Sequence, residues 1–248
     1  MLPSQGVWRA YARDVRQRAG PNLQIFYLVP ADGPDRRLDL DGTIARSVNA
    51  ATTWFETESG GLRLRVEAEF GRQVLFHRSL RSRSGWLSLG KYAAYEIERE
   101  FGEVGWDSSK SVLGVYFDGP NGQTCGDSIS PDHVNAGRLA ILYLSSPWPT
   151  DRPCRSVPLA VDGGRPGYWE FLLLHEIVHA LGFVPSCARH VAALGHVSDS
   201  PADLMYRGPL AWAPEKLDYK RDDYFRHRKA GCPDLADSPF LALRQAAD

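Results

Sequence analysis

HEIVHALGFVPSCARHVAALGHVSDSPADLMY, residues 175–206, is the stretch that decides the expected fold and chemistry. On an α-helix, His175 and His179 are four residues apart, so their imidazoles project from one face about 6 Å apart along the axis. That separation suits two nitrogen ligands, each about 2.0–2.1 Å from one zinc ion. Glu176 lies about 100° around the helix, beside the metal, where its carboxylate can take a proton from water. We therefore predict that His175 and His179 bind Zn²⁺ and that Glu176 is the catalytic base.

The same helix is expected to pack under a sheet. Its other face carries a broad apolar stripe made of Leu173, Leu174, Ile177, Ala180 and Leu181. Gly182 follows where a left-handed residue usually ends a helix. The histidines are thus expected to face a cleft, and the leucines to face the core.

The stretch resembles the metzincin clan of zinc endopeptidases, whose signature HExxHxxGxxH precedes a turn containing methionine. The residues that match are His175, Glu176, His179 and Gly182, whereas Pro185 stands at the place of the last histidine. Residues 194–206, LGHVSDSPADLMY, are similar to the matrixin ending, in which a ligand histidine precedes Leu-Met-Tyr. The leishmanolysin branch is similar as well, because it reads HALGF after the second histidine and has its third histidine beyond an insertion.

The resemblance implies that His196, placed after an insertion, is the third zinc ligand and that Met205 lies in a turn beneath the metal. His190, inside the insertion, is the rival ligand, and a carboxylate or no third ligand are the remaining alternatives. Asp199 and Asp203 are expected to serve in turns or caps, with hydrogen bonding to the ligand loop as the alternative.

The first two thirds of the chain alternate strands and helices. Apolar or alternating runs bounded by turn residues predict strands at 24–31, 62–70, 112–119 and 138–146. Helical spacing predicts helices at 39–61 and 91–105 and a third from Tyr168. This order indicates an α+β fold, α/β-like in its upper lobe, with a mixed, mostly parallel twisted sheet and packed helices.

We expect one catalytic domain over residues 1–248. Its upper lobe, 1–182, would hold the sheet and the active-site helix, and a loop-rich lower lobe, 183–248, would hold the third ligand and the methionine turn. In metzincins an antiparallel edge strand above the zinc binds extended substrate, and the resemblance implies that 138–146 is this strand.

The composition narrows the range of partners. The 248 residues have a formal net charge of −1, which gives no electrostatic reason to expect nucleic acid. No run of 18 apolar residues is present, so no membrane span is predicted. The opening residues lack the apolar core of a signal peptide, as expected of a processed or trimmed chain.

Four cysteines, none in a CxxC pair, favour two disulfides over a cysteine-rich metal site. Three connectivities are available, of which we favour Cys125–Cys154 with Cys187–Cys232, because each pair then lies in loop-like sequence. Four buried free thiols are the alternative. Disulfides would indicate an extracellular or secreted protein.

The sequence therefore predicts a monomeric zinc-dependent endopeptidase that acts on protein or peptide substrates. A non-catalytic, zinc-stabilised binding module on a peptidase scaffold is one alternative, and a zinc hydrolase acting on a non-peptide amide is another. The acidic segments 118–127 and 222–227 suggest calcium as a further cofactor. They lack the oxygen pattern of an EF-hand loop, so the sequence does not support calcium binding.

Overall fold

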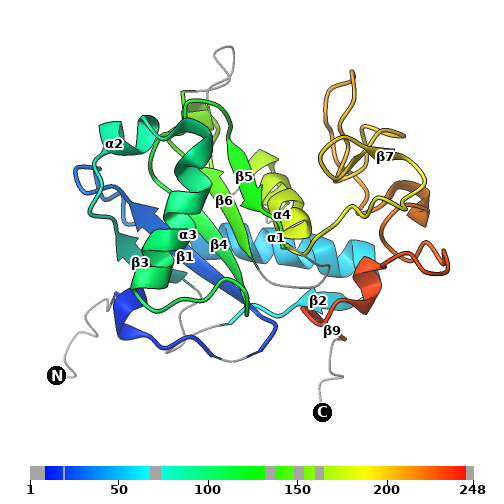
Figure 1. Ribbon diagram of the computed structural model, residues 1–248, viewed down its shortest axis with the longest axis horizontal. Helices are drawn as coiled ribbons and strands as arrows, with labels where there is room; N and C mark the ends of the chain where they lie inside the picture. Colours follow the sequence, from blue (N-terminus) through cyan, green and yellow to red (C-terminus); the bar gives the residue numbers. More distant parts are fainter. Residues whose placement is uncertain are drawn as a thin grey trace.

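A computed structural model describes residues 9–18, 20–67, 74–131, 138–147, 154–159 and 165–243. Its centre is a five-stranded sheet with the strand order β3-β1-β4-β6-β5 (Figure 1). The strands are β1 (Leu23–Val29), β3 (Val74–Arg78), β4 (Val112–Phe117), β5 (Gly126–Ile129) and β6 (Leu139–Tyr143). All neighbours pair in parallel except β5, which is antiparallel to β6. The predicted mixed, mostly parallel sheet is confirmed.

Helices cover both faces of this sheet (Figure 1). They are α1 (Thr43–Ser59), α2 (Arg83–Leu87), α3 (Ala93–Glu103) and α4 (Tyr168–Ala180). Strand β1 is buried along its whole length, as a central parallel strand must be. Its residues Ile25 and Tyr27 pack in the core that includes α1 and α4, whereas Phe26 and Leu28 pack in the core that includes α3. This alternation follows from the two-residue period of a strand.

Buried polar contacts anchor the start of α4, and a glycine turn ends it. The Glu170 carboxylate accepts hydrogen bonds from the Gly167 N–H at 2.8 Å and from the Ser47 hydroxyl on α1. At the other end, Gly182 has φ +85° and donates to the His179 carbonyl, while Phe183 N–H donates to the Val178 carbonyl. This hydrogen-bond pair is a Schellman motif, which only a left-handed residue permits. The predicted end of the helix at Gly182 is confirmed.

One prediction about strands is wrong, and another is confirmed in part. β6 was expected to be the edge strand, yet it lies between β4 and β5, and β5 forms that edge of the sheet. In the predicted strand 62–70, Leu62–Leu64 (β2) is regular and pairs with β9 (Leu241–Leu243) outside the main sheet. Val66 adds an isolated parallel bridge to Leu23 of β1, and residues 68–70 lie outside the described part. Strand β5 is short and flanked by polar residues, and the partner of β2 lies far along the chain. Neither pairing therefore leaves a local pattern in the sequence from which it could be predicted.

Residues 183–243 contain little regular structure and lie beside α4, drawn yellow to red in Figure 1. They form a two-residue hairpin, β7 (Val191–Ala192) with β8 (His196–Val197), and the 3₁₀ turns Tyr219–Arg221 and Leu235–Asp237. Further 3₁₀ turns in the earlier part are Ala12–Asp14, Gly90–Tyr92 and Cys154–Ser156. The irregular character predicted for this last part of the chain is confirmed.

Both expected disulfides are present. Cys125 is bonded to Cys154 and Cys187 to Cys232, with Cα separations of 5.5 and 5.8 Å. The first joins the residue before β5 to the turn after β6, and the second ties the chain after α4 to the segment near the C-terminus. The favoured connectivity is confirmed, and the free-thiol alternative is excluded.

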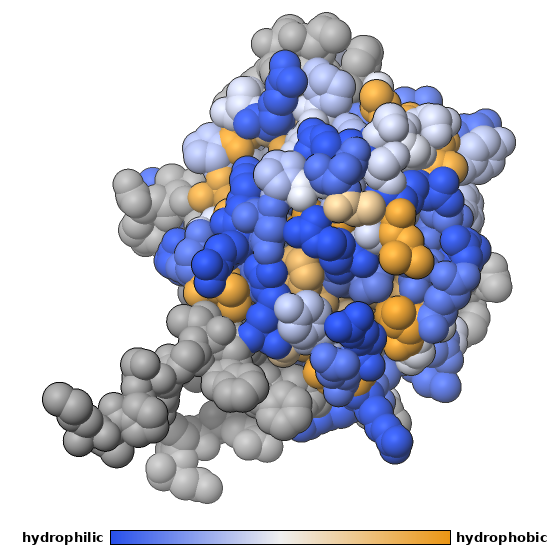
Figure 2. Space-filling model, turned by 90° about the vertical axis from the view of Figure 1, so that its left-hand side faces the viewer, coloured by the Kyte–Doolittle hydropathy of each residue, from blue (hydrophilic) through white to orange (hydrophobic). Residues whose placement is uncertain are grey.

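The face shown in Figure 2 is mostly hydrophilic, with hydrophobic residues in small separate patches. Within the described residues, every helix is too short or too polar to cross a membrane.

Candidate metal centre

Three histidines from two parts of the chain meet at the C-terminal half of α4. His175 and His179 extend from the helix, and His196 comes from β8. One nitrogen of each lies within 4.8 Å of the others, and the Nε2 atoms of His179 and His196 are 3.3 Å apart. Tetrahedral zinc with Zn–N bonds near 2.0 Å holds its nitrogen ligands about 3.3 Å apart. The three histidines could therefore hold a metal ion such as zinc with little movement.

Backbone carbonyl groups orient all three rings. The Nδ1–H groups of His175, His179 and His196 donate to the carbonyl oxygens of Leu204, Phe183 and Ala193 at 2.8, 3.0 and 3.0 Å. A carbonyl oxygen only accepts, so each Nδ1 carries the proton and each Nε2 keeps its lone pair. Hydrogen bonds of this kind fix the tautomer and ring direction of a metal-binding histidine.

The surroundings keep the imidazoles neutral. Burial lowers the pKa of His175 to about 4, and it lowers the pKa of His179 well below its usual range. Burial also lowers the pKa of His196. Mutual repulsion between the rings acts in the same direction on His175 and His179. Neutral imidazole is the form that binds a metal, so the electrostatics agree with the geometry.

Glu176 lies next to this group on α4 and is almost fully buried, with 6% of its surface exposed. Burial raises the pKa of Glu176 to about 8, and the negative charge of Asp127 on β5 adds to the effect. A Cβ atom at Gly126 would lie only 2.6 Å from the Glu176 Oε1 atom. The carboxylate thus occupies the space that a side chain at Gly126 would fill, and the backbone of β5 borders the carboxylate on that side.

A cleft of about 1110 Å³ opens over the histidines. Its walls include β5 residues on one side, α4 at the base, and the hairpin residues Leu194, Gly195 and His196 on the other side. Because β5 pairs with β6 on one side only, its outer edge has no partner among the described strands. The three histidines and Glu176 are therefore reached through an open groove bordered by a sheet edge.

A turn at residues 203–206 supports His175 from below. The Leu204 carbonyl that accepts the His175 bond also accepts the Trp212 indole N–H at 3.1 Å. Met205, fully buried, donates its N–H to the Asp203 carboxylate at 2.7 Å. The role expected for Asp203 within a turn is therefore confirmed.

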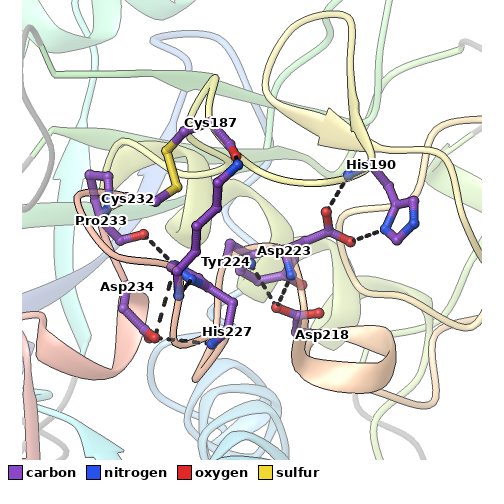
Figure 3. The surroundings of a disulfide bond; sticks show 10 residues. Cys187, His190, Asp218, Asp223, Tyr224, His227, Cys232, Pro233 and Asp234 are labelled. Atoms are coloured by element: carbon purple, nitrogen blue, oxygen red, sulfur yellow. Dashed lines mark hydrogen bonds and ion pairs between the residues drawn. A yellow bond between two sulfur atoms is a disulfide. The ribbon is translucent and has the colours of Figure 1, made fainter.

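The rival ligand His190 lies apart from the three-histidine group. Its Nδ1 atom is 2.9 Å from the Asp223 carboxylate, which also accepts the His190 N–H (Figure 3). The turn or cap role expected for Asp199 is wrong, since its carboxylate oxygens accept no hydrogen bond from another described residue. Asp199 instead lies near His190, with its Oδ2 atom 3.9 Å from Nδ1.

Gly126 and Asp127, the β5 neighbours of Glu176, have no sequence signal that marks them as part of the site. Their segment is notable in the sequence for its acidic residues, and four residues with one large apolar side chain give no strand signal. The one available hint was Cys125, whose predicted disulfide with Cys154 places this segment next to the turn after β6.

No protein-family model and no curated protein matches the chain. Two solved structures of OgpA from Akkermansia muciniphila are similar to it. Catalytically inactive OgpA in complex with an O-glycopeptide substrate, glycodrosocin, is 12% identical with a TM-score of 0.36, over 76% of this chain and 54% of that chain. Wild-type OgpA is 13% identical with a TM-score of 0.38, over 88% and 62%. This chain thus spans less than two thirds of the OgpA chains, and a TM-score below 0.5 does not establish a common fold.

Proposed function

We propose that this protein is a zinc-dependent endopeptidase of the metzincin type, with His175, His179 and His196 as ligands and Glu176 as general base. The observation that carries the proposal is the convergence of three Nε2 lone pairs beside a buried carboxylate, in a groove open to a polymer. A purely structural zinc site would have a fourth protein ligand and no use for Glu176. The open groove therefore favours catalysis over the binding-module alternative.

Zinc bound here would supply Lewis acidity, polarising a substrate carbonyl and making a water molecule more acidic. Glu176 takes a proton from the attacking water as it adds to the carbonyl carbon. The same carboxyl then donates this proton to the leaving amine nitrogen as the C–N bond breaks. A pKa of about 8 at Glu176 lies close to neutral pH, and a positive ion nearby would lower it. Such a group can both accept and return a proton.

The groove suits an extended peptide. The outer edge of β5 can pair with a substrate strand, so that backbone hydrogen bonds place one peptide bond over the histidines. β5 thus takes the role that the sequence analysis assigned to residues 138–146. This arrangement favours peptides over small amides, which would gain nothing from a sheet edge. The two disulfides support an extracellular site of action.

Glu176→Gln tests this function. The variant should keep zinc affinity at the three-histidine centre but lose roughly a thousandfold or more in kcat/KM, because only the proton transfer is removed. His179→Ala and His196→Ala should lose both zinc and activity. The measurements are zinc affinity by competition with a chelator and cleavage of an unstructured peptide library read by mass spectrometry.

Glu215→Gln is the matched control, because it makes the same change at an exposed glutamate whose side chain lies outside the groove. It should cleave like the wild type. Wild-type rates from Glu176→Gln, or full activity after the chain has been stripped of metal, would show that the proposal is wrong.

A further inference from the structure

A second cluster of metal-binding side chains lies at the base of the β7–β8 hairpin. His190 precedes β7 and Asp199 follows β8, and the His190 carbonyl accepts the Ser198 N–H at 3.1 Å. The two ends of the hairpin are therefore side by side. Asp222 and Asp223 reach the same place from the segment after the turn Tyr219–Arg221.

The donor atoms are close enough to share one ion. One donor from each of His190, Asp199, Asp222 and Asp223 lies within 4.8 Å of the others. The His190 Nδ1 atom is 2.9 Å from Asp223 Oδ2, 3.8 Å from Asp222 Oδ1 and 3.9 Å from Asp199 Oδ2. These separations lie on both sides of the roughly 3.3 Å that tetrahedral zinc imposes on its ligands.

Asp199 independently points to a cation. Its side chain is nine-tenths buried, with 10% of its surface exposed, and its carboxylate is directed at the cluster. Neither of its oxygens accepts a hydrogen bond from another described residue, and the same holds for Asp222 Oδ1. Buried carboxylate oxygens without donors are costly unless a cation compensates them.

Within the part of the chain that the structure describes, the nearby cations do not balance this charge. Three carboxylates carry three negative charges, against at most one positive charge on His190 and one on Arg189, which pairs with the other oxygen of Asp222 at 3.0 Å. One negative charge is left uncompensated, and the Asp199 oxygens have no hydrogen-bond donor from another described residue. A divalent cation among the four side chains would supply both the charge and the missing contacts.

We propose that His190, Asp199, Asp222 and Asp223 form a second zinc site, separate from the three-histidine centre. The His190 nitrogen and three carboxylates give the four donors that zinc prefers once the ion displaces the proton that Nδ1 donates to Asp223, whereas calcium takes six to eight oxygens and no nitrogen. The ion joins both ends of the hairpin that carries His196 to residues 222–223. The site is therefore structural, and it holds the third histidine of the first centre in position.

Zinc content of the purified full chain tests this site. After equilibration with buffered zinc and removal of free metal, mass spectrometry should find two zinc ions per wild-type chain. Asp199→Asn should bind one, His179→Ala one, and the double variant none. Asp237→Asn is the matched control, since it removes the same charge from an exposed position in the same part of the chain, and it should bind two.

Each result separates the second site from the proposed function. A single wild-type zinc that is kept in Asp199→Asn and lost in His179→Ala would overturn the second site and leave the endopeptidase proposal intact. A single wild-type zinc that is lost in Asp199→Asn and kept in His179→Ala would overturn the three-histidine centre instead. Two zinc ions in Asp199→Asn, or calcium binding in place of the second zinc, would overturn the assignment. If Asp199→Asn does not fold, the wild-type count and Asp222→Asn decide the matter by the same criteria.

Discussion

Two regions of this protein differ in how their backbone hydrogen-bonding groups are satisfied. The sheet region, residues 20–182, consists of strands and helices whose apolar faces form two cores on either side of the sheet. The carboxylate region, residues 183–243, has few regular elements, and several of its backbone N–H groups bond to the buried aspartates Asp203 and Asp218. Its apolar side chains pack in the same core as α1 and α4. The structure of the sheet region follows from repeating hydrophobic patterns in the sequence, whereas that of the carboxylate region depends on single aspartate residues.

Asp218 illustrates the carboxylate region best. Its Oδ2 atom accepts the backbone N–H groups of Asp223, Tyr224 and Phe225 at 3.2, 2.7 and 2.7 Å. Figure 3 shows this carboxylate below Asp223 and Tyr224, near the Cys187–Cys232 disulfide. One side chain thus satisfies donors that a strand neighbour would satisfy in a sheet.

The three-histidine centre combines the two regions. His175 and His179 have fixed positions because α4 is packed between α1, the sheet and the C-terminal segments. His196 depends on the hairpin, and hence on the carboxylates around it. His175 and His179 also donate to carbonyl groups of this region, at Leu204 and Phe183. Disturbing the carboxylate region should therefore displace His196 and loosen the orientation of the other two rings, whose backbone stays on α4.

The largest expected effect is on the stability of the carboxylate region in Asp218→Ala. Three buried N–H groups would lose their acceptor, at about 1–3 kcal/mol each, so we expect a loss of about 3 kcal/mol or more. Amide hydrogen exchange should accelerate at Tyr224 and Phe225 while β4 stays protected, because none of the lost hydrogen bonds involves the sheet.

Ile141→Ala in β6 is the counterpart in the sheet region. Removal of this buried side chain should cost about 2–5 kcal/mol and accelerate exchange in β4. Equal acceleration in both regions by both variants would show that the molecule opens as one unit and would remove the distinction.

Gly126→Ala should have an intermediate effect, on catalysis. The new methyl group would lie 2.6 Å from Glu176 Oε1 and 2.9 Å from Leu172, so the carboxylate must shift. We expect kcat to fall about 10- to 100-fold with zinc affinity unchanged, because displaced catalytic groups lose rates of this size. Gly122→Ala, whose Cβ atom would meet its nearest neighbour at an ordinary 3.4 Å, is the control and should retain its rate. A normal kcat for Gly126→Ala would mean that β5 does not position Glu176.

The smallest expected effect is the pH dependence of stability. Burial raises the pKa of Asp203 to about 8 and that of Asp218 to about 6, against an ordinary value near 3.8. From about pH 4 up to about pH 8 for Asp203 and about pH 6 for Asp218, each of these two carboxyls therefore holds more of its proton in the folded state than in the unfolded state, and its contribution to stability falls as pH rises. The lowered pKa values of His175, His179 and His196 act in the opposite direction below about pH 6.5. The slope is at most about 1.4 kcal/mol per pH unit for each group. Urea unfolding of the wild type and of Asp203→Asn at pH 7 and pH 8, above the range in which the histidines titrate, isolates the Asp203 contribution. The free energy of unfolding should fall more steeply with pH in the wild type than in the variant, and equal slopes would contradict the assignment.

Much of the sheet region was predictable from the sequence. The periodicity of 43–59 and 93–103 and the continuous apolar runs of β1, β4 and β6 specify elements that local interactions favour. Strand order was not predictable, because β5 pairs with β6 through backbone groups that carry no sequence signal. The edge strand was for this reason assigned to the wrong segment.

For the candidate site, the sequence by itself determined the shared helix face of His175 and His179 and the position of Glu176 beside them, since a helix converts a spacing of four residues into proximity. Only the tertiary structure decided that His196 joins them while His190 meets Asp223. His190 and His196 are six residues apart in irregular chain, where no repeating backbone geometry fixes the direction of a side chain from its position in the sequence. Their positions follow from a hairpin register and from aspartates some 30 residues away, and such contacts exist only after folding.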